Sequence, residues 1–271
     1  LYKMSPRIGF SHVITDQSTF TFNYGLYYQT PIYDNVYRNT SQQEDPEEAL
    51  EEIGADGEIG NATMTAQRTQ SYEFGFNVQV GRNWAYSIMG WVKDMDQMVT
   101  ARRYSAGFYE YQVQENGSFG SAKGIDFTLE NRGQMINTMI QYTYSVAKAN
   151  EAYSTEAFGG EYVDSPMQES IMPFDRTHDL TVTLYTSSLP FGLNASLTGF
   201  YQSGAPYTPY IMYSQGEPLE DYLNPYSERS SAYKKIDLSI SKDIRYKDYS
   251  ISMGVNVYNL LDDRNEGQVY P

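Results

Sequence analysis

The sequence has no cysteine, only two histidines, and fewer basic than acidic residues. The absence of cysteine excludes disulfides and thiolate metal sites. His12 and His178 are too few to form a recognisable catalytic or metal-binding set, so we expect no enzyme activity, no metal and no cofactor. The formal net charge of −15 argues against nucleic acid as a partner, because phosphate backbones bind basic surfaces.

Long hydrophobic runs are also absent. No stretch of about 18 apolar residues occurs, which excludes a transmembrane helix. A membrane β-barrel remains compatible with the sequence, because only alternate residues of its strands face lipid. Aromatic residues are abundant: the 271 residues include 27 Tyr, 12 Phe and 2 Trp. Tyrosine suits both β-strands and the headgroup level of a membrane.

Residues 173–209 read as one complete hairpin. Leu180, Val182 and Leu184 alternate with polar residues, Pro190 and Gly192 suit a turn, and the alternation then resumes from Leu193. Such a period of two places one set of side chains on each face of a sheet. Each arm has about the 9–11 residues that a tilted strand needs to cross a bilayer.

The same pattern recurs along the chain and predicts about ten strands. They are residues 7–14, 19–28, 72–80, 84–93, 124–130, 136–146, 179–185, 193–202, 235–241 and 249–257. Short turns alternate with long connections, the last three of which span 94–120, 148–172 and 205–232. This asymmetry is typical of outer-membrane barrels. A soluble β-sandwich would also alternate, but its strands are usually shorter, about 5–6 residues.

Charge separates the two predicted faces. One face carries charged residues and the opposite face has almost none; the charged positions are Glu73, Asp126, Glu130, Asp179, Lys235 and Asp237. We therefore expect an all-β fold, an antiparallel transmembrane β-barrel, with a polar lumen and an apolar outer surface. Segment 84–93 has large residues on both faces, so its inner and outer sides stay undecided. His12 falls on the lipid-side register.

The long connections carry the candidate binding residues. Arg102 and Arg103 are suited to an anionic substrate or a lipopolysaccharide phosphate, although a solvated pair is the simpler interpretation. Tyr207, Tyr210 and Tyr213 offer aromatic faces for a sugar, haem or chelate, or for packing between loops.

Two further clusters have alternative interpretations. The acidic run 44–58 either binds Ca²⁺ or forms a solvated face, and residues 45–54 have the capping signals of a short helix. Asp175, His178 and Asp179 could touch a metal, but bracing of a loop base by hydrogen bonds is the favoured interpretation.

Four segments, in order along the chain, resemble the barrel of TonB-dependent outer-membrane receptors. They are SPRIG followed by FNYG at 5–9 and 22–25, GSAKGIDFTLE at 120–130, FDRTHDL with SGAPYT at 174–180 and 203–208, and VYNLLD at 257–262. The resemblance implies a barrel of about 22 strands filled by a plug. On this basis we expect residues 1–271 to be the C-terminal portion of such a barrel, with the plug and the closing strands outside this chain.

What the resemblance implies about function is active transport. The cell outer membrane is the expected location, and the TonB–ExbB–ExbD complex, acting through the plug, is the expected partner. Other expected partners are outer-membrane lipid and lipopolysaccharide, a scarce small-molecule or oligomeric nutrient, and a surface lipoprotein. The alternatives are a passive porin, a surface adhesin or structural barrel, and a soluble β protein.

Overall fold

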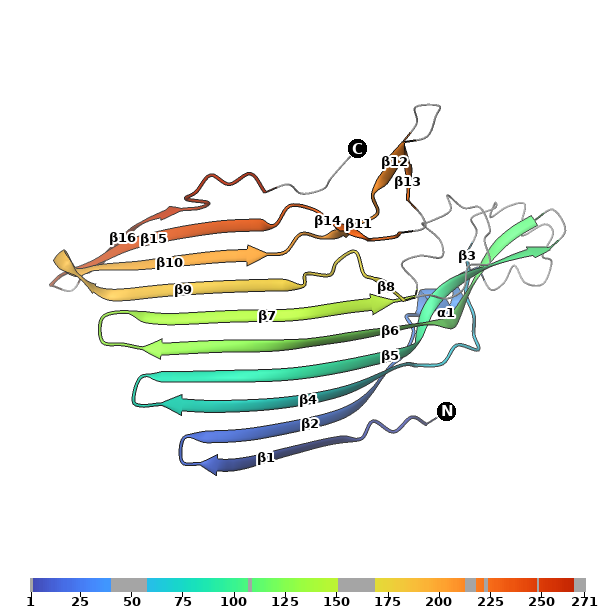
Figure 1. Ribbon diagram of the computed structural model, residues 1–271, viewed down its shortest axis with the longest axis horizontal. Coiled ribbons are helices and arrows are strands. Elements are labelled where there is room, and N and C mark those ends of the chain that lie inside the picture. The colour runs from blue at the N-terminus through green and yellow to red at the C-terminus, as the bar shows by residue number, and fades with distance from the viewer. Residues whose placement is uncertain are drawn as a thin grey trace.

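The computed structural model describes residues 2–39, 58–106, 109–150, 169–212, 218–221, 224–247 and 249–265. Most of them belong to one antiparallel sheet (Figure 1). Its ten principal strands are β1 (Arg7–Thr15), β2 (Ser18–Gln29), β4 (Gln67–Val80), β5 (Trp84–Ala106), β6 (Tyr109–Arg132), β7 (Asn137–Ala149), β9 (His178–Leu189), β10 (Leu193–Gln202), β15 (Tyr233–Tyr246) and β16 (Tyr249–Val257).

These ten strands pair in the order in which they occur in the chain, as an up-and-down meander. All ten predicted strands are therefore confirmed, and so is the antiparallel order. The sheet is open, with β1 and β16 at its two edges among the described residues. No helix in the described part of the chain is long and apolar enough to cross a membrane.

Connection length differs between the two ends of the sheet. Tight turns join the strands at one end, and the longer connections lie at the other end, together with the N-terminus (Figure 1). Gly81 begins the β4–β5 turn with φ +64°, a left-handed conformation that glycine adopts without steric cost. The 3₁₀ turn η3 (Pro190–Gly192) closes the β9–β10 hairpin. The predicted asymmetry of the connections is thus present.

The pairing register separates an apolar face from a polar one. Phe22 pairs with Phe74, and their ring centroids are 5.1 Å apart; the adjacent Phe20 and Phe76 rings are 5.0 Å apart. These rows continue through β5, β6 and β7, so this face of the sheet is apolar across its middle. His12 pairs with Phe20, which confirms that it lies on this outward side.

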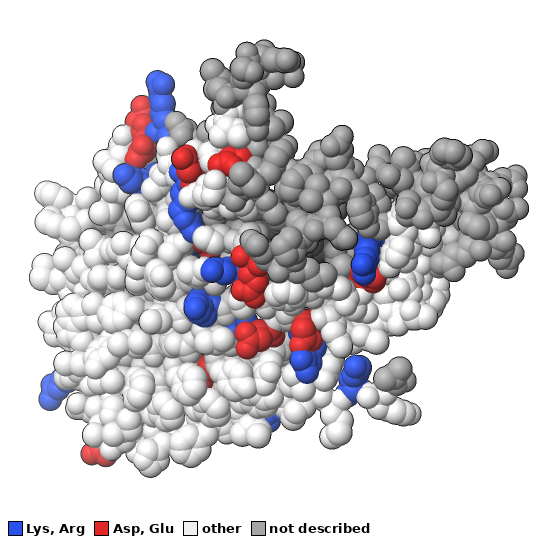
Figure 2. All heavy atoms as spheres, turned by 45° about the vertical axis from the view of Figure 1, so that its right-hand side comes forward, with Lys and Arg blue, Asp and Glu red and all other residues white. Residues whose placement is uncertain are grey.

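The sheet has almost no core of its own. Ile59 and Ala149 are the only buried apolar residues among those described, whereas many large apolar side chains of the outward face are exposed. A soluble protein rarely leaves so large an apolar surface in water. Figure 2 shows one broad surface that is almost free of charge, beside a band of charged residues near the loops. A single layer of this kind fits a barrel wall whose outward face meets lipid.

Two strands extend well beyond the rest of the sheet. β5 and β6 pair from Trp84 and Asn131 to Ala106 and Tyr109, so residues 94–106 and 109–120 of the second long connection lengthen these two strands. The predicted strands 84–93 and 124–130 were therefore too short at the end that faces the loops. Register shifts near Met98 interrupt the pairing where the extension leaves the main sheet, and Gln97 there has φ 55°.

The remaining elements are short and lie in the long connections. They are α1 (Tyr33–Tyr37), β3 (Glu58–Ile59), β8 (Ser170–Ile171), β11 (Pro206–Tyr207), β12 (Tyr210–Met212), β13 (Pro218–Glu220) and β14 (Glu228–Arg229). β11 pairs with β14 and β12 with β13, so the fourth long connection, which joins β10 to β15, contains two small sheets of its own. The predicted helix at 45–54 lies outside the described residues.

Candidate functional site

The inward face of the sheet carries fixed polar groups. Trp91 Nε1 donates to Asp126 Oδ2 at 3.0 Å, and Thr143 Oγ1 donates to Asp126 Oδ1 at 2.8 Å. The indole lies against Gly124, where a Cβ would come within 2.7 Å of the ring. Three strands thus position one carboxylate and one large ring on the polar side.

The pairing of β5 also shows which side chains of segment 84–93 face inward and which face outward. Trp84 pairs with Val80 and lies on the outward register, whereas Trp91 pairs with Glu73 and lies on the inward one. Further along the polar face, Gln202 Nε2 donates to Asp179 Oδ2 at 2.6 Å. At both places, side chains of the polar face bond to one another.

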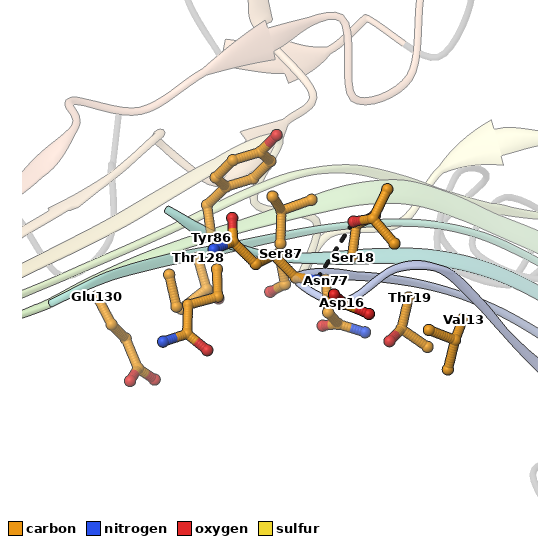
Figure 3. Close-up of a pocket in the computed structure, with 14 residues that line it drawn as sticks. Val13, Asp16, Ser18, Thr19, Asn77, Tyr86, Ser87, Thr128 and Glu130 are labelled. Atoms are coloured by element: carbon orange, nitrogen blue, oxygen red, sulfur yellow. Dashed lines mark hydrogen bonds between the residues drawn. The ribbon is translucent and has the colours of Figure 1, made fainter. Parts of the chain in front are cut away.

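A hollow of about 440 Å³ lies on the inward face at the turn end. Thr19, Asn77, Gln79, Ser87 and Glu130 contribute to its lining. Figure 3 shows Thr19 and Glu130 pointing to one side of the sheet and Tyr86 to the other. Its polar lining suits water or a polar protein segment, and it lies at the opposite end from the candidate residues in the loops.

Arg102 belongs to the extension of β5. Its Nη1 lies 3.6 Å from Glu115 Oε1, and its guanidinium carbon lies 5.8 Å from the ring centroid of Tyr104. Tyr104 in turn donates its hydroxyl to Glu115 Oε2 at 3.3 Å. Arg103 pairs with Gln112 through the backbone, and its side chain is outside the described part of the structure. A contact of either arginine with a substrate stays a prediction.

The candidate tyrosines lie in the fourth connection. The Tyr207 hydroxyl donates to Glu228 Oε2 at 2.8 Å, across the β11–β14 pair. This hydrogen bond, with desolvation and the charge of the carboxylate, raises the pKa of Tyr207 above its ordinary value. Tyr210 begins β12 in the other small sheet and is exposed, while Tyr213 lies outside the described residues. Arg102, Tyr207 and Tyr210 thus come from three separate sheets.

A buried junction at the base of the fourth connection combines residues that are distant in sequence. The Asp175 carboxylate accepts hydrogen bonds from Ala147 N at 2.8 Å, Thr177 Oγ1 at 3.0 Å and Arg229 Nη2 at 2.7 Å. Arg229 Nη1 also donates to the carbonyl of Gly204 at 3.0 Å. The junction joins β7 to β14, so it holds the base of the fourth connection against the sheet.

The neighbouring residues of this motif each engage a different partner. His178 Nδ1 is 2.8 Å from the Tyr142 hydroxyl, and Asp179 accepts from Gln202. Among the described residues, no group of three or more His, Asp or Glu side chains is arranged to hold a metal ion. The hydrogen bonds favour the interpretation of this segment as a braced loop base. Arg229 was not identified from the sequence, because nothing local links it to Asp175.

A second junction holds the first long connection, which joins β2 to β4. Asn116 Oδ1 accepts from Thr65 N at 2.7 Å, and its Nδ2 donates to the carbonyls of Thr65 at 3.0 Å and Gln97 at 2.8 Å. The last of these bonds reaches the irregular part of β5. Sequence reasoning missed Asn116, because its partners lie on two other segments. Both junctions fix the bases of the loops above the barrel wall.

An open sheet with one lipid-facing side, one polar side and long connections at a single end defines a segment of an outer-membrane β-barrel wall. The β-barrel of TonB dependent receptor-like proteins matches residues 2–260. The chain belongs to this family and lies in the cell outer membrane. The family is one of receptors and transporters rather than enzymes.

Solved structures agree on the fold. The outer membrane transporter YddB from Escherichia coli has a TM-score of 0.70 and 15% identity, covering 96% of this chain and 37% of that one. A ferric enterobactin receptor from Pseudomonas aeruginosa in complex with enterobactin has a TM-score of 0.62 and 16% identity, covering 96% of this chain and 35% of that one. The ferric-catecholate import receptor Fiu from E. coli has a TM-score of 0.60 and 14% identity, covering 95% of this chain and 30% of that one.

The chain thus spans about a third of the length of the solved structures that it matches. No curated protein matches its sequence.

Proposed function

We propose that this chain forms part of an active-transport receptor, which binds a scarce nutrient at its loop end and imports it with energy from the TonB–ExbB–ExbD complex. The observation that carries the proposal is the way in which the loops are attached. Asp175 and Asn116 tie two long connections to the strand ends, so binding groups there stand on a rigid wall. Residues held by a rigid scaffold bind without a large ordering cost.

The barrel wall alone does not perform transport in this proposal. A plug outside this chain fills the lumen, contacts the polar inward face and transmits the pull of the TonB complex. The ten strands form part of a barrel of about 22. The open edges β1 and β16 support this, because unpaired strand edges are not tolerated in hydrocarbon. The intact mass of the mature protein tests it, and we expect about three times the mass of this chain, since the chain covers 37% of YddB.

The nutrient is a small molecule or an oligomer that contacts the loop residues. We assign the contacts to Arg102, Arg103, Tyr207, Tyr210 and Tyr213, which combine cationic and aromatic groups. Ferric siderophores are the first ligands to test, because two structural neighbours are a ferric-catecholate import receptor and a receptor in complex with enterobactin.

The experiment measures accumulation of labelled ferric siderophores, cobalamin, glycans and peptides in three strains. These are the parent, a strain lacking the receptor, and a strain lacking TonB. We expect one class of ligand to accumulate only in the parent. Accumulation that requires the receptor but persists without TonB would identify a passive porin. If no ligand requires the receptor, a surface adhesin or structural barrel is the better description.

A further inference from the structure

The outward face ends in polar aromatic groups on the side of the loops. Tyr24 and Tyr72 pair across β2 and β4, with ring centroids 5.1 Å apart, and Gln70 Nε2 lies 3.2 and 2.7 Å from their hydroxyls. Further along the sheet, Tyr142 bonds to His178, whose ring lies 5.4 Å from that of Tyr144. Tyrosine at such positions marks the level of the membrane headgroups.

Two lysines stand on this same face, next to the aromatic groups. Lys123 pairs with Val146 and Val92, in the row of Tyr72, and Lys148 pairs with Ser121 in the following row. The register therefore makes Lys123 and Lys148 diagonal neighbours, with about 7–8 Å between their backbones. Both side chains are exposed, and neither has a salt bridge within the described part of the chain.

The charged side chains near Lys123 and Lys148 do not neutralise the two lysines. Arg68 forms an ion pair with Asp96, so that cation is neutralised. Asp94 lies in the row of Lys148 and diagonal to Lys123, and Glu169, next to β8, lies diagonal to Lys148. In the described structure neither carboxylate makes an ion pair with either lysine. Figure 2 shows charges of both signs in a band beside the uncharged surface. Two ammonium groups at the edge of an apolar face thus have no ion pair among the described residues.

We propose that Lys123 and Lys148 bind the phosphate groups of an outer-leaflet lipid headgroup. Their long stems carry the charge from the lipid-facing strands towards the headgroup level. The apolar rows directly beside them, including Ile125 and Val146, offer a surface for the acyl chains of the same molecule. A free phosphate ion gains nothing from that surface, so the geometry favours a lipid.

The experiment uses the complete receptor in detergent and measures retention of bisphosphorylated lipid A by native mass spectrometry. The test variant is Lys123→Gln with Lys148→Gln. The control is Lys242→Gln, because Lys242 pairs with Leu193 and Met253 and so lies on the same outward face at the turn end. We expect the double variant to retain roughly tenfold to thirtyfold less lipid A, from the weight of two interfacial cations. The control retains as much as the parent.

Further variants and lipids separate charge from folding. Lys123→Arg with Lys148→Arg keeps the charges and should retain lipid A, while Asp94→Asn removes a nearby negative charge and should increase retention. Dephosphorylated lipid A should bind the parent and the double variant equally. Equal losses in the double variant and in Lys242→Gln, or no loss in either, would overturn the proposal. Displacement of lipid A by millimolar inorganic phosphate would show an anion site that does not select lipid.

Discussion

The guanidinium of Arg229 lies 2.7 Å from the carboxylate of Asp175, although 54 residues separate them in the chain. Only 1% of the Asp175 side chain is exposed, against 30% for Arg229. A carboxylate so deeply buried requires a cation or several hydrogen-bond donors, and Asp175 has both. This pair is therefore a buried attachment of the fourth connection to the barrel wall.

Substitution of Asp175 by asparagine should loosen that attachment without removing the strand. The side-chain amide of Asp175→Asn would keep an acceptor for Ala147 N but lose the ion pair with Arg229. Charge-assisted hydrogen bonds are worth about 1.5–3 kcal/mol, and partial exposure of Arg229 favours the lower end. We expect amide hydrogen exchange in β11 and β14 to rise about tenfold. Exchange measured by mass spectrometry on the complete receptor tests this.

A matched control is Asp243→Asn, which removes the same charge from an exposed residue bonded to Ser252 at the turn end. It should leave exchange in β11 and β14 unchanged. If Asp175→Asn also leaves that exchange unchanged, the Asp175–Arg229 pair does not hold the connection.

Gly204 provides a steric test of the same region. A Cβ at this position would overlap the carbonyl oxygen of Ser230, which is backbone and cannot rotate away. Gly204→Ala should therefore separate β11 from β14, at a cost of about 1–3 kcal/mol. We expect trypsin to cleave after Arg229 about tenfold faster than in the parent.

Gly90→Ala is the control for this substitution, because nothing lies within 4 Å of a Cβ at Gly90. It adds the same methyl group to the main sheet and should leave cleavage after Arg229 at the rate of the parent. Slow cleavage in Gly204→Ala would mean that the loop accommodates the methyl group.

The contact between Tyr207 and Glu228 predicts a pH dependence. The raised pKa of Tyr207 means that the folded protein holds the phenolic proton more tightly than the unfolded chain does. The contact therefore contributes stability below the ordinary tyrosine pKa of about 10, and this contribution is lost as the pH rises through the raised value. We expect the Tyr207 Cζ resonance, assigned with Tyr207→Phe in ¹³C-labelled protein, to titrate above the ordinary value. Glu228→Gln should lower the midpoint; an unchanged midpoint would contradict this origin of the shift.

The strands and their faces could be predicted because each depends on local alternation. Leu180, Val182 and Leu184 indicate a strand without reference to any partner, and the lipid requires one apolar face along the whole sheet. The limits of β5 and β6 could not be predicted in the same way. Past Met95 the register shifts and the two strands extend beyond the rest of the sheet, so the period of two no longer follows one continuous pair of faces.

The junctions of the loops could not be predicted, because they depend on contacts between distant segments. Asp175 was identified as part of a loop base, but its partner Arg229 lies in a separate two-residue strand. Asn116 lies in a stretch without apolar alternation, and it binds Thr65 from a different connection. Single polar residues of this kind have no periodic pattern, and only the folded chain brings them together.

The two tryptophans lie on opposite faces of β5. Trp84 pairs with Val80 on the outward, apolar side and is 44% exposed, whereas Trp91 lies on the inward side with its indole N–H bonded to Asp126. A shift of the β5 register by one residue would exchange these two environments, because it turns every side chain of the strand to the other face. The sides of the tryptophans therefore report the register of β5.

Fluorescence quenching by lipids with brominated acyl chains should distinguish them. In a receptor reconstituted into such bilayers, Trp91→Phe leaves Trp84 as the only tryptophan of this chain, next to hydrocarbon, and we expect most of its emission to be quenched. Trp84→Phe leaves Trp91, which the barrel wall separates from lipid, so quenching should be weak. Fluorescence from tryptophans elsewhere in the receptor is subtracted with the variant that lacks both Trp84 and Trp91.

Because Trp91→Phe also removes the donor to Asp126, Thr143 becomes the remaining side-chain donor to that carboxylate. Unchanged heat resistance of the barrel is the check on folding. Strong quenching of Trp91 with weak quenching of Trp84 would mean that the assigned lumen and lipid faces must be exchanged.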